Sequence, residues 1–158
     1  MEIRGIQPAD HEMIDQLLEE LDTTKKHIGK RAAKLRQELN YQPMLEIVAE
    51  EDGQLCGTAS LHEITLNEIV CVAMGPIAEK HGRLEPLLAE LKQRALSSGF
   101  RFIVWQPVGE IDPQDYGFEP AASHELYLLG QEKGQRKVYV LQLIEDSLAG
   151  LSGQIKFN

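Results

Sequence analysis

An almost unbroken apolar run, EIVCVAMGPIA at residues 68–78, constrains the fold more than any other stretch of this chain. Strands that are buried on both faces have this pattern, whereas half-exposed strands alternate. The next segment, residues 83–98, repeats its leucines at helical spacing, and a second apolar strand pattern follows at residues 100–108. A buried strand, a helix and another strand predict a parallel crossover, which places the chain in the α/β class.

Patterns on either side of this crossover extend it to a mixed sheet. Residues 2–7, 44–50 and 55–64 have strand patterns, and Asp52-Gly53 predicts a hairpin turn between the last two. Helical spacing predicts helices after Pro8 and over residues 24–39, and two more strand patterns lie at residues 123–129 and 137–144. We therefore expect a mixed central sheet of about seven strands flanked by helices, in one domain over residues 1–158.

Charge and apolar content narrow the location and the partners. The formal net charge of −9, from 25 acidic and 16 basic side chains, repels phosphate backbones and argues against general nucleic-acid binding. No apolar run approaches the roughly 18 residues that span a bilayer. The N-terminal segment MEIRGIQPADHE has no apolar core of the kind that signal peptides carry. We expect a cytoplasmic protein that binds neither nucleic acid nor membrane.

The cysteines and histidines indicate neither redox nor metal chemistry. Cys56 and Cys71 lie in apolar strand-like segments, which favours two small buried side chains over a disulfide. The five histidines include no pair at ligand spacing, so the sequence predicts no metal site.

The order of the predicted elements and several motifs resemble the GNAT superfamily of N-acetyltransferases. IRGIQPADHEMIDQLL is similar to the family's first strand and helix, LEIVAEEDGQLCGTASL to its next two strands, and VAMGPIA to its central strand. LAELKQRALSSGFRFIVW resembles the helix and strand after the pyrophosphate loop, DPQDYGFEPA a turn with Gly-Phe, and LIEDSLAGLSGQIKFN the ending of one bacterial acetyltransferase subgroup. The resemblance covers nearly the whole chain. It implies transfer of an acetyl group from acetyl-CoA, as co-substrate, to an amine of a small molecule or peptide.

In this family a glycine-rich loop at a helix N-terminus binds the cofactor's pyrophosphate, because free backbone amides favour anions. The loop here departs from the family pattern: Gly82 is the one expected glycine that it keeps, Glu79 adds a negative charge, and Pro86 removes a donor. A phosphate site remodelled with basic side chains and a decayed site both stay open. The resemblance assigns the pantetheine arm and the pyrophosphate to seven residues: Met74, Ile77, Ala78, Lys80, His81, Gly82 and Arg83.

Two residues carry the predicted catalysis. Glu68 enters the central strand, where the family often places a carboxylate that helps to deprotonate the amine; His62 and Glu63 are alternatives, and each of these could instead be a solvated strand end. The family's general acid, a tyrosine that protonates the CoA sulfur, would stand where this chain has Pro113. Tyr116 is the nearest tyrosine, so it is either the acid or a packing aromatic.

A second kind of function stays open. The departures at the loop and at the tyrosine position also fit a catalytically degenerate GNAT-fold module that binds or regulates. A homodimer through the C-terminal strands is compatible with either function. The acceptor would be framed by the first two helices and residues 109–115, and the basic surface at residues 25–36 either attracts an acidic acceptor or is a solvated helix face.

Overall fold

The fold is known from a computed structural model, which describes residues 1–128 and 137–157. The chain forms two compact units. The first contains Met1–His62 and Met74–Arg94, and the second contains Glu63–Ala73 and Ala95–Asn158. Each unit is therefore built from two separate stretches of sequence.

The sheet of the first unit has an antiparallel core of three strands. These are β1 (Glu2–Gly5), β2 (Glu46–Glu51) and β3 (Gln54–Leu66), whose last residues belong to the second unit. The predicted hairpin turn is confirmed: Asp52 and Gly53 have φ angles of 53° and 77°, which the left-handed region of such a turn requires. A short strand, β5 (Ala78–Glu79), pairs with β3 at Gly57 and Thr58.

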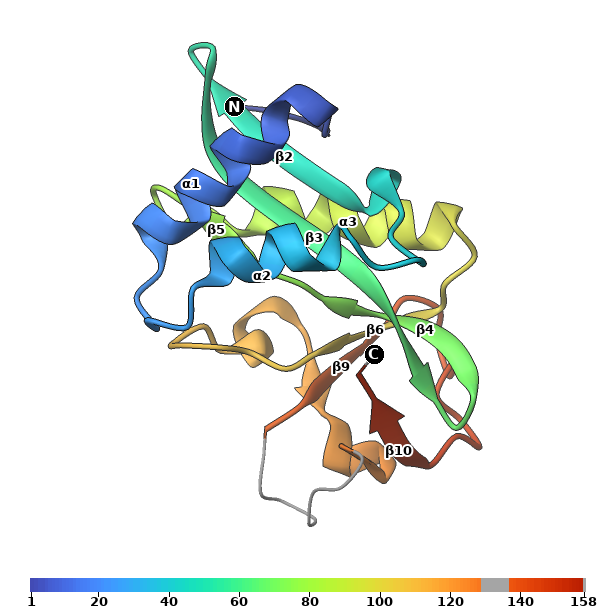
Figure 1. Ribbon diagram of the computed structural model, residues 1–158. Helices are drawn as coiled ribbons and strands as arrows, with labels where there is room; N and C mark the ends of the chain where they lie inside the picture. Colours follow the sequence, from blue (N-terminus) through green and yellow to red (C-terminus); the bar gives the residue numbers. More distant parts are fainter. Residues whose placement is uncertain (129–136, 158) are drawn as a thin grey trace. The chain divides into compact units, whose positions relative to one another are not determined.

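Three helices flank this sheet. α1 (His11–Leu21) and α2 (Ile28–Leu35) lie on one face of β2 and β3, and α3 (Glu85–Ser97) lies on the other face along its part in the first unit (Figure 1). α2 is shorter than the predicted helix over residues 24–39. The reason lies in the preceding loop, where the Asp22 side chain accepts a hydrogen bond from the backbone N of Thr24 at 2.8 Å and His27 adopts a left-handed φ of 56°.

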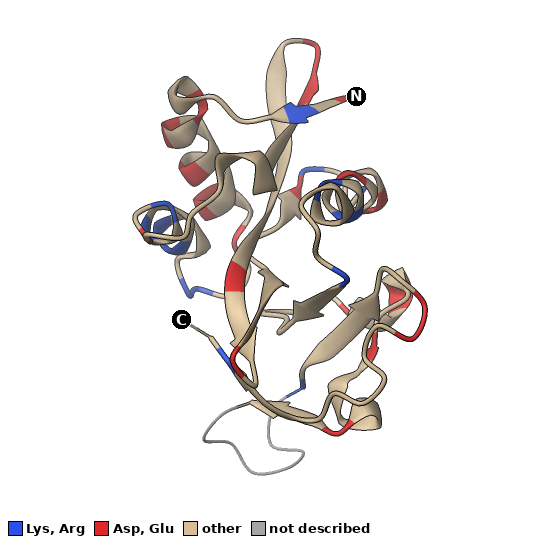
Figure 2. Ribbon diagram, turned by 90° about the vertical axis from the view of Figure 1, so that its right-hand side faces the viewer, with Lys and Arg blue, Asp and Glu red and all other residues tan. Residues whose placement is uncertain are grey.

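A buried ion pair fixes α2 to the sheet. Arg36, which follows the last residue of α2, donates to Glu46 of β2 over 2.6 Å and to Asp15 of α1 over 2.8 Å. Tyr41 donates its hydroxyl to the same Glu46 over 2.8 Å. Arg36 was expected on the basic surface at residues 25–36, but its side chain is only 8% exposed, so this expectation is wrong. Figure 2 shows the remaining basic residues along α2 and the acidic residues along α1.

The second unit contains the parallel pair that the sequence predicts. β4 (Ile69–Met74) and β6 (Phe102–Trp105) run parallel, with Val72 opposite Ile103 and Ala73 opposite Val104. The remaining strands of this unit are β7 (Glu119–Pro120), β8 (Leu126–Leu128), β9 (Tyr139–Gln142) and β10 (Gly153–Lys156). β9 joins β6 to β7, and β10 pairs with β8 and with the end of β3.

The described residues thus form ten strands rather than about seven. One extra strand arises because the apolar run at residues 68–78 is interrupted at Gly75-Pro76, where proline has no N–H for a ladder, and continues as β5. β7 and β10 are the other two, and β10 lies in the tail. The prediction at residues 123–129 corresponds to β8; residue 129 lies outside the described residues. Short 3₁₀ helices connect the elements at Pro8–Asp10, Pro43–Leu45, Pro113–Tyr116 and Ala121–His124.

Both cysteines are buried free thiols, as predicted. Cys56 lies in the first unit and Cys71 in the apolar core of the second. Burial raises the pKa of Cys71 to about 12, so this thiol stays protonated and unreactive at neutral pH. Within residues 1–128 and 137–157, no helix is long and apolar enough to cross a membrane.

Candidate functional site

The four residues predicted to bind pyrophosphate form the connection between β5 and α3, in the first unit. Lys80, His81, Gly82 and Arg83 are all exposed. Gly82 has a φ of 72°, and a Cβ on it would meet no atom within 4 Å. This glycine is therefore required by the turn of the backbone and not by a close neighbour.

The backbone amides of this loop already have hydrogen-bond acceptors within the protein. Oε2 of Glu79 accepts from the amides of His81 and Arg83, both at 2.7 Å. The amide of Gly82 donates to the Glu79 carbonyl at 3.1 Å, and that of Lys80 donates to the Cys56 carbonyl at 2.8 Å. The Glu79 carboxylate therefore occupies the centre of the loop, in the place that the sequence assigns to an external anion.

Arg83 completes the surroundings of this carboxylate. Its Nη2 lies 3.1 Å from Oε1 of Glu79 and 2.7 Å from Oε2 of Glu51 on the neighbouring hairpin. Burial by itself would raise the pKa of Glu79, whose side chain is 0% exposed, but the amide hydrogen bonds from Arg83 and His81 and the Arg83 guanidinium lower it below its ordinary value. Glu79 is therefore ionised at neutral pH, and part of the positive charge of Arg83 is already compensated.

A glycine on β3 makes room for the Glu79 side chain. Gly57 is the register partner of Glu79, and a Cβ on Gly57 would lie 2.9 Å from Cγ of Glu79. Any larger residue would collide with the glutamate as it lies now. Neither Gly57 nor its contact with Glu79 was predicted; the signal in the sequence is a glycine in the interior of a strand, which often marks a close approach.

The segment predicted to hold pantetheine is fixed to β3. The amide of Gly75 donates to the Ser60 carbonyl at 2.8 Å, and a Cβ on Gly75 would collide with the Ser60 hydroxyl. The His62 ring hydrogen-bonds the backbone of Met74. Burial and the positive charge of Arg31 lower the pKa of His62 to about 4, although the hydrogen bond to Met74 acts in the opposite direction. The imidazole is therefore neutral at pH 7.

Met74 and Ile77 are buried, whereas Ala78 is half-buried. The structure thus brings all seven predicted cofactor residues together in one unit.

Both predicted catalytic residues lie in the second unit. Glu68 is exposed in the turn between β3 and β4, where it has a left-handed φ of 69°, so it precedes β4 instead of belonging to it. Tyr116 is half-buried at the end of a 3₁₀ helix, and its ring centroid lies 6.2 Å from that of Trp105. Trp105 in turn packs edge-on against Phe118 at 5.1 Å. The roles of Glu68 and Tyr116 stay predictions.

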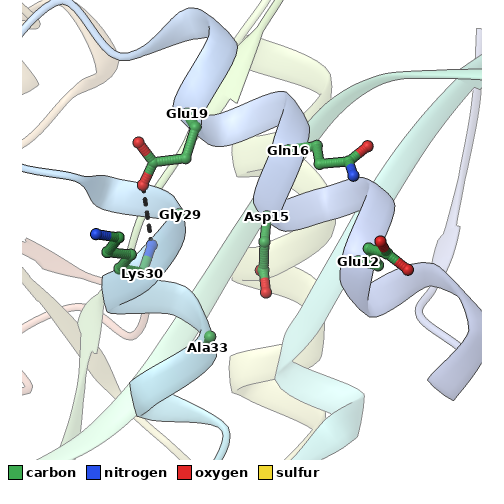
Figure 3. Close-up of a pocket in the computed structure, with 7 residues that line it drawn as sticks. All are labelled: Glu12, Asp15, Gln16, Glu19, Gly29, Lys30 and Ala33. Carbon is green, nitrogen blue, oxygen red and sulfur yellow. Dashed lines mark hydrogen bonds between the residues drawn. The ribbon is translucent and has the colours of Figure 1, made fainter.

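An open groove of about 590 Å³ lies between α1 and α2 in the first unit (Figure 3). Its described lining residues are Glu12, Asp15, Gln16, Glu19, Gly29, Lys30 and Ala33. The backbone of Lys30 donates to Glu19 at 3.1 Å, which holds the two helices together at one end. The predicted cofactor and catalytic residues are not among these lining residues. The groove is formed by α1 and α2, the two helices that are expected to frame the acceptor.

The chain is similar to solved structures of acetyltransferases. Its fold matches the GNAT family N-acetyltransferase YhbS from Escherichia coli in complex with CoA, with a TM-score of 0.84 and 26% identity over 99% of this chain and 89% of YhbS. A GNAT family acetyltransferase from Brucella melitensis in complex with acetyl-CoA gives a TM-score of 0.64 at 19% identity, over 99% of this chain and 95% of that one. YncA from Salmonella typhimurium with acetyl-CoA gives 0.60 at 22%, over 92% and 95%. Searches with family models and against curated protein sequences gave no match.

Proposed function

Because this chain belongs to the GNAT superfamily of N-acetyltransferases, we propose that it transfers an acetyl group from acetyl-CoA to an amine. The observation that carries this proposal is the likeness to CoA-bound YhbS over 99% of the chain. That likeness spans both compact units, so residues 1–158 would work together as one acetyltransferase domain. The acceptor is an amine of a small molecule or peptide, and the expected location is the cytoplasm.

The strand segment after β4 suits the proposed contact with the pantetheine arm. Acetyl-CoA supplies an acetyl thioester, whose carbonyl carbon is attacked by a neutral amine. Met74, Ile77 and Ala78 would border the arm with their backbone, because the hydrogen bond between Gly75 and Ser60 keeps this segment beside β3. The connection between β5 and α3, in contrast, does not fit a diphosphate while the Glu79 carboxylate accepts hydrogen bonds from the amides of His81 and Arg83. Lys80, His81, Gly82 and Arg83 stay the proposed diphosphate residues once this carboxylate has moved away.

Catalysis needs one group that takes a proton from the amine and one that gives a proton to the departing thiolate. We assign the first role to Glu68, whose carboxylate is exposed, and the second to Tyr116, because a phenol carries an O–H donor. Glu68→Gln keeps the shape but not the basicity, so we expect kcat/KM to fall by about 10²-fold or more. Glu145→Gln, at an exposed glutamate of the same unit to which no role is assigned, is the matched control.

Binding of acetyl-CoA is the first test. A ligand that binds the folded state stabilises it by mass action, by about 2.7 kcal/mol at a concentration of 100 times its Kd. We expect millimolar acetyl-CoA to raise the melting temperature, and we expect a panel of amines to include one that releases free CoA thiol. Absence of any shift at millimolar acetyl-CoA would contradict the proposal. A shift without thiol release for any amine would support the degenerate binding module instead.

A further inference from the structure

A buried carboxylate lies where the proposed function needs a free anion site. We infer, on the basis of the proposed function, that Glu79 is an internal competitor of the cofactor's diphosphate, so that CoA binds with its full affinity only when this side chain leaves the loop. The carboxylate would thus act as a built-in inhibitory contact, and its removal would increase the affinity for CoA.

The hydrogen bonds of the loop establish the competition. One oxygen, Oε2 of Glu79, accepts from two backbone amides at 2.7 Å, and the other oxygen lies 3.1 Å from the Arg83 guanidinium. Backbone amides that converge in this way form an anion-binding nest, and a phosphate oxygen would need the same donors. Each amide has a single hydrogen, so the carboxylate and a diphosphate cannot both be bound well.

The site is built for this side chain. The space that Glu79 crosses exists because β3 has a glycine there, with a hypothetical Cβ on Gly57 only 2.9 Å from Cγ of Glu79. Glu51 contacts the same Nη2 of Arg83 at 2.7 Å, so a second acidic residue helps to hold the guanidinium beside the carboxylate. Gly57 leaves room both for this side chain and for the backbone of β5, whose Ala78 carbonyl would lie 3.2 Å from the same Cβ.

The pairing that holds β5 against β3 does not depend on this carboxylate. The pairing of β5 with β3 uses backbone atoms of Ala78 and Glu79, and these bonds do not depend on the glutamate side chain. Lys80, His81 and Arg83 are exposed, so solvent and ligand have access to the loop from outside. Displacement therefore exchanges one buried anion for another, while the released carboxylate regains its hydration.

The test measures CoA and pantetheine binding by calorimetry to wild type and Glu79→Ala. Pantetheine lacks the diphosphate. We expect Glu79→Ala to bind CoA about tenfold or more tightly than wild type and to bind pantetheine within about twofold of wild type. Glu85→Ala is the matched control, because it removes the same charge from the first turn of α3 without vacating the nest; we expect about the wild-type CoA affinity. Equal or weaker CoA binding by a folded Glu79→Ala would overturn the inference.

A second measurement separates this inference from the proposed function. Inorganic pyrophosphate is titrated into ¹⁵N-labelled protein while the amide signals of His81 and Arg83 are followed. We expect these signals to shift in Glu79→Ala and to stay in place in wild type. If no variant binds CoA but this pattern is seen, the proposed function fails and the competition stands. Equal shifts in both proteins would overturn the competition and leave the proposed function untouched.

Melting curves show whether Glu79→Ala is folded. If it is not, Glu79→Gln replaces it in both experiments, since the amide keeps the shape of the side chain and removes its charge. A neutral oxygen accepts more weakly than a carboxylate. We expect Glu79→Gln to bind CoA about threefold or more tightly than wild type. An unchanged CoA affinity and unmoved amide signals in this variant would overturn the inference.

Discussion

Gly57 and Glu79 are register partners in the β3–β5 pairing, and the position of the glutamate side chain depends on the absence of a side chain at Gly57. The glutamate folds back over the strand to reach two amides further along its own chain, and the glycine leaves the space that this path needs. From the sequence alone, Glu79 places an unfavourable negative charge near a predicted anion site. In the structure, its own carboxylate is the anion that the amides of this site bind.

A double-mutant cycle tests this dependence. Gly57→Ala alone should lower the free energy of unfolding by about 1–3 kcal/mol, because its Cβ collides with the Glu79 side chain. In the Glu79→Ala background the Cγ is absent, so the cost should be smaller by about 1 kcal/mol or more. Urea denaturation of wild type and the three variants measures the coupling. Strictly additive costs would show that the two side-chain positions are independent.

His62 gives stability a dependence on pH. Its pKa is 6.5 in the unfolded chain and about 4 in the folded protein, chiefly because of burial. Between these values the unfolded state binds more protons, so the free energy of unfolding falls as the pH falls from about 6.5 to 4. We expect a loss of about 1–2 kcal/mol from this residue between pH 7 and pH 5.

His62→Gln should remove this part of the pH dependence, and chemical denaturation at both pH values measures it. Identical pH dependence in wild type and His62→Gln would mean that the imidazole is protonated equally in both states.

Helices and hairpins could be predicted from nearby residues, whereas pairings between strands far apart in the sequence could not. The β2–β3 hairpin and the helix α3 follow from turn chemistry and helical spacing, which involve only a few consecutive residues. β10 exists because it pairs with the end of β3, where Ile155 lies opposite Leu66. The residues of the tail do not by themselves identify β3 as the pairing partner. The loop before α3 lies where the sequence places it, but the occupation of its amides depends on the rotamer of one side chain. Spacing contains no information about that rotamer.

The ion pair between Arg36 and Glu46 attaches α2 to the sheet. Arg36→Ala leaves Glu46, which is 5% exposed, as a buried charge without its guanidinium partner. Breaking a buried pair in this way costs about 3–5 kcal/mol. Arg101→Ala, at an exposed arginine of the second unit, should change stability by no more than about 0.5 kcal/mol. Thermal and urea unfolding measure both, and equal effects of the two substitutions would show that the pair does not stabilise the fold.

For the whole molecule, the net charge of −9 opposes a polyanionic cofactor. Arg83 is already paired with Glu51 and Glu79, so it does little to reverse the repulsion. Salt screens charges beyond roughly 8–10 Å, and long-range repulsion slows association at low ionic strength.

We therefore expect the CoA association rate constant to rise about two- to threefold between roughly 20 and 200 mM NaCl. Stopped-flow fluorescence measures this rate, and uncharged pantetheine is the control that should not respond. A rate that falls with salt would show that local positive charge at the loop outweighs the charge of the whole protein.

The interleaving of the two units also matters while the protein is being synthesised. A ribosome that has released residues up to Arg94 has delivered every part of the first unit, but only Glu63–Ala73 of the second. The apolar strand β4 therefore has no parallel neighbour until β6, which begins at Phe102, has been synthesised. During that interval the nascent chain carries an unpaired hydrophobic edge of the kind that chaperones recognise and that aggregates when they are scarce.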